Sequence, residues 1–328
     1  MLAISCGDGI IEILIINFNH MKILVTGGAG FIASNLVDKL IEAGHQVVII
    51  DDLSTGLKEY INPQAHFYQM DIAAPKVEEI FALQKFDLVF HLAAQISVIK
   101  SVENPELDNR INVLGGLNIL ACCWKHQVKK IIFVSTGGAL YGEAEVIPTS
   151  EDYPAWPLSP YGIHKLTFEK YLNYYSVVFG QAYTALRLAN VYGPRQYKGG
   201  ECGVVSIFID NAVNDRESII NGDGSKTRDF IYVSDVVEAL MKTIGTDYAG
   251  AINIGTGIEK SVNDVVLAIE LALGKSIKKK NGPAKAGEQK RSCLDIKKAK
   301  EILNWESQVM LDDGIRKTIA WSKAKLDK

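Results

Sequence analysis

Tyr161 and Lys165 form the pair of side chains whose types and spacing point most directly to chemistry in this chain of 328 residues. Both lie in Ser159-Pro-Tyr-Gly-Ile-His-Lys165, and proline favours the first turn of a helix, so a spacing of four places both side chains on one helix face. A free tyrosine has a pKa of about 10, so acting as a base near neutral pH requires about 4 kcal/mol of help. One cation about 4 Å away, at an effective dielectric near 20, supplies about that much. The pair predicts a proton-transferring tyrosine supported by lysine; the alternative is an ordinary surface helix.

A glycine-rich turn near the start of the chain predicts a cofactor for this chemistry. An apolar, β-branched run at residues 22–26 predicts a buried parallel strand, and an amphipathic run at residues 31–43 predicts a helix. In the turn between them, Gly27 can adopt backbone angles closed to other residues, and Gly30 lets the main chain approach a pyrophosphate. The N–H groups at the start of the following helix attract that negative charge. The turn therefore predicts a bound dinucleotide; a tight turn without a ligand is the alternative.

A carboxylate at the expected distance strengthens the dinucleotide interpretation. An apolar run at residues 46–50 ends in Asp51, which lies 21 residues after Gly30. A carboxylate at this place is expected to bind ribose hydroxyls, and its charge repels a 2′-phosphate, so NAD is favoured over NADP. The polar stretch 52–56 is well placed to continue the ribose contact. Ala33 stands where a third glycine is usual, and its methyl group is the smallest possible departure.

The alternation of elements after this unit predicts a doubly wound α/β fold. Apolar runs at residues 66–70, 86–94 and 130–135 predict further strands, and residues 108–125 predict a helix between the last two. Such alternation indicates a Rossmann-type parallel sheet with helices on both faces and ligands at the carboxyl ends of the strands. We leave His91, at such an end, without a chemical role, because a single histidine there is more often a packing residue.

We expect two lobes. Residues 21–186 would form the NAD-binding Rossmann domain, and residues 187–328 mainly a smaller α+β substrate-binding lobe, since glycine-rich turns separate shorter elements there. Residues around 226–245 are expected to fold back on the first domain. Residues 1–20 would be an extension outside the fold, with an added edge strand as the alternative.

The composition excludes several classes of function. The chain is 48% hydrophobic and 22% charged with a net charge of −3, which argues against nucleic-acid or membrane-surface partners. The apolar patch at residues 10–16 is too short to span a bilayer. The cysteines show neither a disulfide framework nor metal-ligand spacing, so we expect a reducing cytoplasm and no metal site; they are Cys6, Cys122, Cys123, Cys202 and Cys293.

Taken together, these motifs resemble the extended short-chain dehydrogenase/reductase superfamily and, within it, the UDP-glucose 4-epimerase family of nucleotide-sugar enzymes. The resemblance covers residue 21 to about residue 305, nearly the whole chain. The matching stretches are Thr26-Gly-Gly-Ala-Gly-Phe-Ile32, Asp51-Asp-Leu-Ser-Thr-Gly56, His91-Leu-Ala-Ala-Gln95, Ser135-Thr-Gly-Gly-Ala-Leu-Tyr-Gly142, Ser159-Pro-Tyr161 with Lys165, Leu186-Arg-Leu-Ala-Asn-Val-Tyr-Gly-Pro-Arg195, Arg228-Asp-Phe-Ile-Tyr-Val233 and Asn253-Ile-Gly-Thr-Gly257.

The resemblance implies a role for each matching position. Tyr161 would be the base and Lys165 its partner, and Asn190 and Arg228 would bind the phosphates of a sugar nucleotide. Val204, Asn221 and Val262 fall where the family surrounds the nucleotide. The expected NAD contacts are Gly27, Gly30, Phe31, Ile32, Asp51, Asp52, Ser54, Thr55, Gly56, Asp71, Ile72, Leu92, Ala93, Ala94, Gln95, Ser135, Tyr161 and Lys165.

Three departures from the family pattern bear on the site. The usual place of the catalytic Ser or Thr holds Gly137, so either Thr136, which we favour, or Ser135 would supply the hydroxyl. A phosphate-binding arginine near the C-terminus is replaced by Lys285, which Arg291 would compensate. Ser292 stands where a bulky residue can narrow the sugar pocket, which suggests tolerance of a 2-N-acetyl group.

These residues favour a 4-epimerase that acts on UDP-glucose and UDP-galactose with tightly bound NAD. Related dehydratases commonly carry an Asp-Glu pair after the catalytic threonine, whereas this chain has Gly137-Gly138. Two alternatives stay open: another NAD-dependent nucleotide-sugar enzyme, such as a UDP-glucuronate decarboxylase or epimerase or a GDP- or dTDP-sugar dehydratase, and a non-catalytic NAD-binding regulator. The family commonly forms homodimers through the helices near residues 108–125 and 161–179, and we expect a homodimer here.

Overall fold

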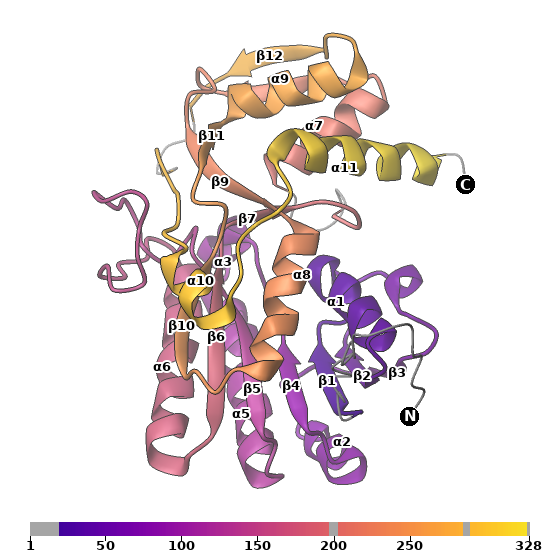
Figure 1. Cartoon of the computed structure of the whole chain (residues 1–328), viewed down its shortest axis with the longest axis vertical. Helices are drawn as coiled ribbons and strands as arrows, with labels where there is room; N and C mark the ends of the chain where they lie inside the picture. The colour runs from indigo at the N-terminus through magenta and orange to yellow at the C-terminus, as the bar shows by residue number, and fades with distance from the viewer. Residues whose placement is uncertain (1–19, 197–202, 285–288, 327–328) are drawn as a thin grey trace, which may run out of the picture.

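The computed structural model describes residues 20–196, 203–284 and 289–326. Most of the expected N-terminal extension, and Lys285, therefore lie outside the described residues. A seven-stranded sheet, ordered β10-β6-β5-β4-β1-β2-β3 with every neighbouring pair parallel, forms the centre of the molecule (Figure 1). Its strands are β1 (Lys22–Thr26), β2 (Gln46–Asp51), β3 (His66–Gln69), β4 (Leu88–His91), β5 (Lys130–Thr136), β6 (Ala182–Leu188) and β10 (Gly250–Ile254).

The sheet confirms the predicted doubly wound α/β class. The five strands expected from the apolar runs are β1 to β5, with ends that differ by up to three residues. The strand order reverses between β1 and β4, and this switch point is where such sheets bind ligands. Strands β6 and β10 extend the sheet beyond the strands that the apolar runs predicted. Strand β10 comes from the part of the chain after residue 186 and pairs with β6.

Helices cover both faces of the sheet and enclose two apolar cores. One core joins the sheet to α1 (Phe31–Glu42), α8 (Val233–Lys242) and α10 (Lys297–Leu303). The other joins it to α2 (Val77–Gln84), α5 (Gly116–Lys125) and α6 (Pro160–Phe179). Helix α8, which lies within residues 226–245, packs directly beside α1 (Figure 1).

The helix predicted at residues 108–125 is interrupted by a wider turn. The chain forms α3 (Val98–Glu103) and α4 (Pro105–Asn109), then a π-helical segment, η2 (Arg110–Gly115), and continues as α5. A Cβ at Gly115 would lie 2.8 Å from the Ile72 side chain, so a residue without a side chain is required at this close approach. Segments of π-helix recur at functional sites, and this one lies against α6.

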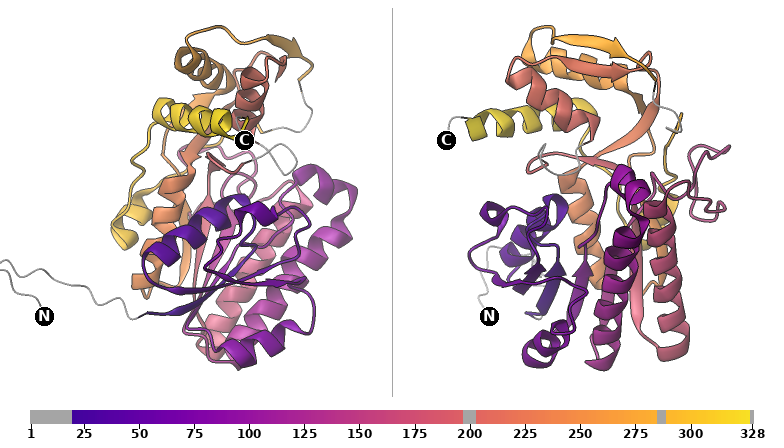
Figure 2. Two further views of the ribbon diagram at one scale, coloured as in Figure 1. Left: turned by 90° about the vertical axis from the view of Figure 1, so that its right-hand side faces the viewer. Right: turned by 180° about the vertical axis from the view of Figure 1, so that it is seen from behind.

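A second lobe lies beyond the carboxyl ends of the strands (Figures 1 and 2). Its own core is built largely from isoleucine, valine and aromatic side chains. Its elements are β7 (Asn190–Tyr192), α7 (Val204–Val213), β8 (Ser218–Asn221), β9 (Thr227–Tyr232), β11 (Glu259–Ser261), α9 (Val262–Leu273), β12 (Lys279–Gly282) and α11 (Leu311–Leu326). Two 3₁₀ turns, η1 (Lys58–Tyr60) and η3 (Thr243–Gly245), complete the described secondary structure.

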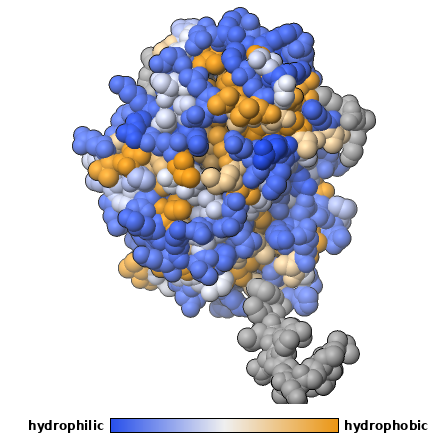
Figure 3. Space-filling view, turned by 45° about the horizontal axis from the view of Figure 1, so that its top comes forward, coloured by the Kyte–Doolittle hydropathy of each residue, from blue (hydrophilic) through white to orange (hydrophobic). Residues whose placement is uncertain are grey.

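The side of the molecule drawn in Figure 3 has no large apolar face. The helices of the described residues also include none that could span a membrane. Hydrophobic side chains on that side form small groups between hydrophilic ones (Figure 3). Within residues 20–196, 203–284 and 289–326, every helix is too short or too polar to cross a bilayer.

Candidate active site

The glycine turn after β1 has the shape that a pyrophosphate requires. Gly27 has φ of +74°, and a Cβ there would lie 2.8 Å from the backbone N and Cα of Ala93, so only glycine lets the two loops approach. Gly30 is the N-cap of α1 and supplies no side-chain hydrogen bond. Phe31 and Ile32 then form the first turn of α1, whose N–H groups point toward the turn. These features fit the phosphates of a dinucleotide.

Asp51 is held at the end of β2 with its carboxylate turned toward the glycine turn. One oxygen accepts a hydrogen bond from Ala29 N at 3.0 Å and the other accepts one from Leu53 N at 2.8 Å. Burial raises the pKa of Asp51, and these two N–H bonds oppose the rise. Gly56 closes over the carboxylate, since a Cβ there would lie 3.0 Å from Asp51 Oδ1. Each carboxylate oxygen keeps a lone pair for a ribose hydroxyl.

The next residues among the expected NAD contacts lie near this carboxylate or just after β3. Asp52 accepts hydrogen bonds from the backbone and hydroxyl of Ser54, which shapes the turn through Thr55. Asp71 follows β3 and forms an ion pair with Arg110 of η2. Ile72 is buried against Gly115 of the same segment. The two stretches therefore flank one end of the expected cofactor path.

The loop after β4 is fixed by Thr26 at the end of β1. Its hydroxyl oxygen accepts hydrogen bonds from Leu92 N at 3.2 Å and Ala93 N at 3.1 Å. The hydroxyl hydrogen is thereby left for His91 Nδ1, which lies 2.8 Å away. Burial lowers the pKa of His91 to about 3, so this histidine is a neutral packing residue. These hydrogen bonds hold residues 92–95 beside the glycine turn, where we expect them to contact NAD.

Helix α6 begins where the sequence predicts and presents Tyr161 in its first turn. The Ser159 hydroxyl accepts a hydrogen bond from Gly162 N at 3.2 Å, and proline occupies the first helical position. A Cβ at Gly162 would lie 2.6 Å from Ala139 O, so the helix starts directly against the loop that follows β5. Tyr161 is half-buried at this junction, at the carboxyl edge of the sheet.

Lys165 lies one turn later and faces both Tyr161 and the sheet. Its ammonium nitrogen is 5.9 Å from the centre of the Tyr161 ring and 4.6 Å from the centre of the Phe133 ring. It donates a hydrogen bond to Val134 O at 2.9 Å, and the residue is only 3% exposed. Burial lowers the pKa of Lys165 to about 8, and the carboxylates of Asp108 and Glu169 oppose that shift. The predicted pair is therefore assembled with its cation buried.

The two candidate hydroxyls at the end of β5 have different partners, because consecutive strand residues point to opposite faces. Ser135 donates its hydrogen to Glu169 Oε1 at 2.5 Å. Thr136 accepts a hydrogen bond from Ala139 N at 3.2 Å, and the described contacts give its own hydrogen no acceptor. Thr136 is thus the hydroxyl that can still donate to a ligand.

Ser135 belongs to a buried polar network that the sequence reasoning missed. Arg187 of β6 contacts both oxygens of Glu169, with the closest pair 2.7 Å apart, and donates to Tyr141 at 2.8 Å. Although burial opposes its charge, these bonds raise the pKa of Arg187. Tyr141 in turn donates to Asn253 of β10 at 2.8 Å. The sequence signals for this network are Glu169, one helical turn after Lys165, and Arg187, which lies inside a stretch that matches the family.

Gly137, at the usual place of the family's catalytic hydroxyl, has a packing reason to lack a side chain. A Cβ there would lie 2.5 Å from Leu294, a buried residue of a segment near the C-terminus. At Gly138, a Cβ would lie 3.6 Å from the side-chain oxygen of Asn190. The structure therefore brings Asn190 beside Gly138, two residues after Thr136, and a side chain at Gly137 would require Leu294 to move.

The segment that carries Ser292 bridges the two lobes. Gln289 donates to Gly142 O in the loop after β5, and Thr227 N donates to Lys290 O at 3.1 Å. Asp229, 1% exposed, accepts hydrogen bonds from Thr256 and from Leu294 N. Burial raises the pKa of Asp229, and its hydrogen bonds oppose that rise. Sequence reasoning missed this carboxylate, although it follows Arg228 in a matching motif.

The remaining substrate-binding candidates gather in the second lobe. Arg228 lies in β9 and donates to Thr227 O at 2.7 Å. Arg291 forms a two-point ion pair with Glu259 of β11, the strand that pairs with β9. The other candidates begin or end elements of the same lobe: Val204 starts α7, Asn221 ends β8 and Val262 starts α9. Ser292 is buried, with 7% of its surface exposed.

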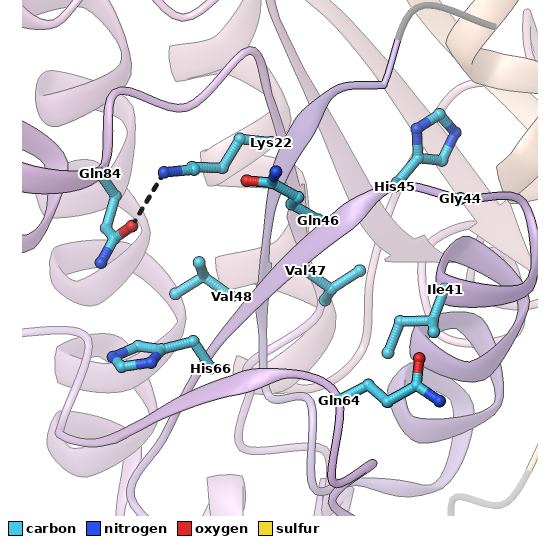
Figure 4. A pocket seen from close by; sticks show the side chains of 10 residues that line it. All are labelled: Lys22, Ile41, Gly44, His45, Gln46, Val47, Val48, Gln64, His66 and Gln84. Carbon is cyan, nitrogen blue, oxygen red and sulfur yellow. Dashed lines mark hydrogen bonds between the residues drawn. The ribbon is translucent and has the colours of Figure 1, made fainter.

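A cavity of about 450 Å³ lies elsewhere, at the amino ends of β1, β2 and β3 (Figure 4). Lys22, His45, Gln46, His66 and Gln84 line it together with several apolar residues. Lys22 donates to Gln84 across it at 3.2 Å. It shares no residue with the candidate site, which lies at the opposite edge of the sheet.

The fold and the site define a Rossmann-class dinucleotide-binding protein with a tyrosine–lysine pair beside its glycine turn. Residues 23–255 match the model of the NAD dependent epimerase/dehydratase family. The chain belongs to this family, and its cofactor is NAD.

Three solved structures show how far the likeness extends. The UDP-glucose 4-epimerase of Thermotoga maritima, solved with UDP-glucose, is 44% identical with a TM-score of 0.92, covering 93% of this chain and 100% of the other. That of Thermus thermophilus, solved with NAD, is 38% identical with a TM-score of 0.88, covering 92% and 99%. The UDP-N-acetylglucosamine 4-epimerase of Methanobrevibacter ruminantium, in complex with UDP-N-acetylmuramic acid, is 33% identical with a TM-score of 0.89, covering 93% and 99%.

Proposed function

We propose that this protein is a nucleotide-sugar 4-epimerase that interconverts UDP-glucose and UDP-galactose. The observation that carries the proposal is the buried ammonium of Lys165, which lies 5.9 Å from the ring centre of Tyr161 at the carboxyl edge of the sheet. The solved relatives include two enzymes named UDP-glucose 4-epimerase, one with UDP-glucose and one with NAD. The glycine turn and Asp51 fit that cofactor.

In the proposed reaction, Tyr161 takes the proton from the 4-hydroxyl of the sugar and later returns it. Lys165 stabilises the phenolate through its positive charge. The glycine turn and Asp51 would hold NAD, which when bound would supply the hydride acceptor and donor for C4 of the sugar; the ketone would turn over between the two transfers. Since Tyr161 gives the proton back at the end of the cycle and is a phenolate again, the chain needs no further acid or base.

We assign the catalytic hydroxyl to Thr136. The hydrogen of Ser135 is committed to Glu169, whereas Thr136 accepts from Ala139 N and retains a hydrogen to donate. A donor aimed at the sugar oxygen stabilises the negative charge that develops there as the proton leaves. Ser135 would support the cofactor site through its backbone and its bond to Glu169.

For the substrate, we propose that Asn190, Arg228 and Arg291 bind the diphosphate, while Val204, Asn221 and Val262 surround the base and ribose. Arg228 and Arg291 lie on or beside paired strands of one small sheet, which supports a joint role. Guanidinium groups suit phosphate because their donors form a planar fork. Arg291 would share its donors between Glu259 and the phosphates. We also propose that Ser292 admits a 2-N-acetyl group.

The packing around Gly137 argues against a dehydratase. Removal of water from the sugar needs an additional acid and base near the 4-ketone, and dehydratases commonly place an Asp-Glu pair after the threonine. Here a side chain at Gly137 would overlap Leu294, with only 2.5 Å between a Cβ and the leucine. A simple epimerisation needs no group at that position.

We further propose that the protein is a homodimer. Helix α6 and the α4–α5 segment lie side by side (Figure 2) and expose apolar side chains at helical spacing. These side chains are Ile163, Tyr171, Tyr174, Val177 and Val178 on α6, and Leu107, Leu114 and Trp124 on the α4–α5 segment. A second copy related by a two-fold axis would cover both stripes. Sedimentation should report a dimer, and Tyr174→Glu should convert it to a monomer.

We propose a cytoplasmic location as well. Cys122, Cys123 and Cys293 are buried free cysteines. Burial raises the pKa of Cys122 to about 11 and that of Cys293 to about 12, so both stay protonated thiols. Such unpaired thiols suit a reducing compartment. Cell fractionation tests the location.

The function is tested by incubating the purified protein with UDP-, GDP- and dTDP-sugars and resolving the products by chromatography and mass. A 4-epimer keeps the mass of its substrate, whereas decarboxylation or dehydration lowers it. Tyr161→Phe should abolish turnover while NAD remains bound, because it removes only the proton acceptor. Tyr175→Phe, on the same helix and outside the proposed interface, is the matched control. Normal turnover by the Tyr161 variant would refute the proposal.

A further inference from the structure

A buried carboxylate next to the catalytic helix has no part in the mechanism described above. Asp108 lies in α4 and is 1% exposed. One of its oxygens lies 2.5 Å from Nδ1 of His164, and the other accepts a hydrogen bond from Nε2 of Gln95, also at 2.5 Å. Gln95 lies in the loop after β4, and its amide additionally donates to Ser97 O at 2.9 Å. Asp108 thus joins the expected cofactor loop to α6.

The position of Asp108 matters because His164 directly precedes Lys165. Two buried carboxylates lie close enough to Lys165 to raise its pKa against the effect of burial: Asp108 and Glu169. Glu169 is already neutralised by its ion pair with Arg187. Within the described residues, Asp108 forms no ion pair with an arginine or a lysine; it contacts His164 and the uncharged amide of Gln95.

We propose that Asp108 is a positioning residue for catalysis: its buried charge sustains the ammonium form of Lys165, and its two hydrogen bonds hold α6 in register with the loop that carries Gln95. The proposal rests on the proposed function, because it takes the lysine cation as the group that supports Tyr161.

The charged and titratable groups around Lys165 come from four elements. They are Asp108 of α4, Tyr161, His164 and Glu169 of α6, His91 of β4, and Arg187 of β6 through its pair with Glu169. His91 is neutral across the working pH range, since burial lowers its pKa to about 3. Asp108 is therefore the anion whose removal changes the lysine environment without breaking an arginine ion pair.

The sign of the expected effect follows from the charge of the working lysine. Lys165 supports Tyr161 while it is protonated, and it loses that proton as the pH rises through its pKa of about 8. Activity should therefore decline on the alkaline side. Removing the charge of Asp108 disfavours the ammonium, so the decline should begin roughly one pH unit lower, a tenfold change in the ratio of charged to neutral lysine.

Two variants separate this electrostatic role from simple packing. Asp108→Asn and His164→Gln both remove the carboxylate–imidazole contact and can keep a hydrogen bond between the two positions, but only the first removes the negative charge of the carboxylate. In the NAD-loaded enzyme, the alkaline limb of kcat should move down by roughly one pH unit in Asp108→Asn and should stay in place or move up in His164→Gln. Equal shifts in both variants, or no shift in the first, would overturn the proposal. Asp108→Ser provides the same loss of charge if the asparagine variant does not fold.

A second measurement keeps the inference separate from the proposed function. NMR of the NAD-loaded protein labelled at the lysine side-chain carbons reports the titration of Lys165 directly, with Lys165→Met identifying its signal. The midpoint should fall by roughly one pH unit in Asp108→Asn only. If the Lys165 midpoint falls in Asp108→Asn but the wild-type protein epimerises no sugar nucleotide, only the proposed function is refuted. If the wild-type protein turns over UDP-glucose but the Lys165 midpoint is the same in Asp108→Asn, only the role of Asp108 is refuted.

Discussion

Replacing the two adjacent hydroxyls at the end of β5 one at a time should have opposite effects on activity and stability. Thr136→Val keeps the shape of the side chain and removes the hydroxyl that is free to donate. Loss of one preorganised donor to a developing oxyanion lowers kcat by about 10²–10³-fold, or about 2.7–4 kcal/mol. The bond lost in the folded protein is the 3.2 Å contact from Ala139 N, so the cost in stability should be only about 1 kcal/mol.

Ser135→Ala should show the reverse pattern. It removes the 2.5 Å hydrogen bond to the buried carboxylate of Glu169 and leaves that oxygen with fewer donors. Leaving a buried polar group short of a partner costs about 1–3 kcal/mol of stability, more when the group is charged. Turnover should stay within about threefold of wild type, because the hydroxyl is turned away from the proposed substrate.

The assay is the initial rate of UDP-galactose conversion, with the two sugar nucleotides separated by chromatography, together with urea unfolding followed by circular dichroism. Thr136→Ser is the control that restores a hydroxyl and should recover most of the activity. A nearly normal kcat for Thr136→Val, together with a large loss for Ser135→Ala, would show that the assignment of the two hydroxyls is wrong.

Three further variants test the network, the cofactor site and the sugar pocket. Arg187→Leu should lower the free energy of unfolding by about 3–5 kcal/mol, because it leaves Glu169 buried and unpaired. Adding Glu169→Leu should recover part of this loss in urea unfolding. A loss under about 1 kcal/mol in Arg187→Leu would contradict the argument. Asp51→Ala should weaken NAD binding by about tenfold or more, measured by titration of the apoprotein, and unchanged affinity would remove the carboxylate from the cofactor site. Ser292→Tyr should stop epimerisation of UDP-N-acetylglucosamine while UDP-glucose still reacts, and equal rates on both substrates would show that this position does not limit the pocket.

The nucleotide-binding unit could be predicted in detail because its signals are local. A strand, a glycine turn and a helix follow one another within residues 22–42, and each has its own residue pattern. The same holds for Tyr161 and Lys165, whose relation depends only on helix periodicity and a proline at the helix start. Family resemblance then extended these local signals to the second lobe.

The polar contacts that support the site could not be predicted, because they join residues distant in the chain. Glu169 meets Arg187 across a helix and a strand, and Asp229 meets Leu294 over 65 positions. In both pairs, the residues around one partner form no local sequence pattern that predicts the other partner. Likewise, the reason for Gly137 became visible only when Leu294 was found against it. Strand β10 was missed because the chain leaves the sheet after β6 and returns about sixty residues later.

That return of the chain limits how the enzyme can be divided or recombined. A fragment cut at residue 186 would end inside β6 and would lack Arg187, β10 and α8. Its newly exposed sheet edge would invite pairing with other molecules, and the apolar face of α1 that α8 covers would meet water. Chimaeras that exchange the sugar-binding part should therefore keep residues 233–254 from the parent that supplies the sheet.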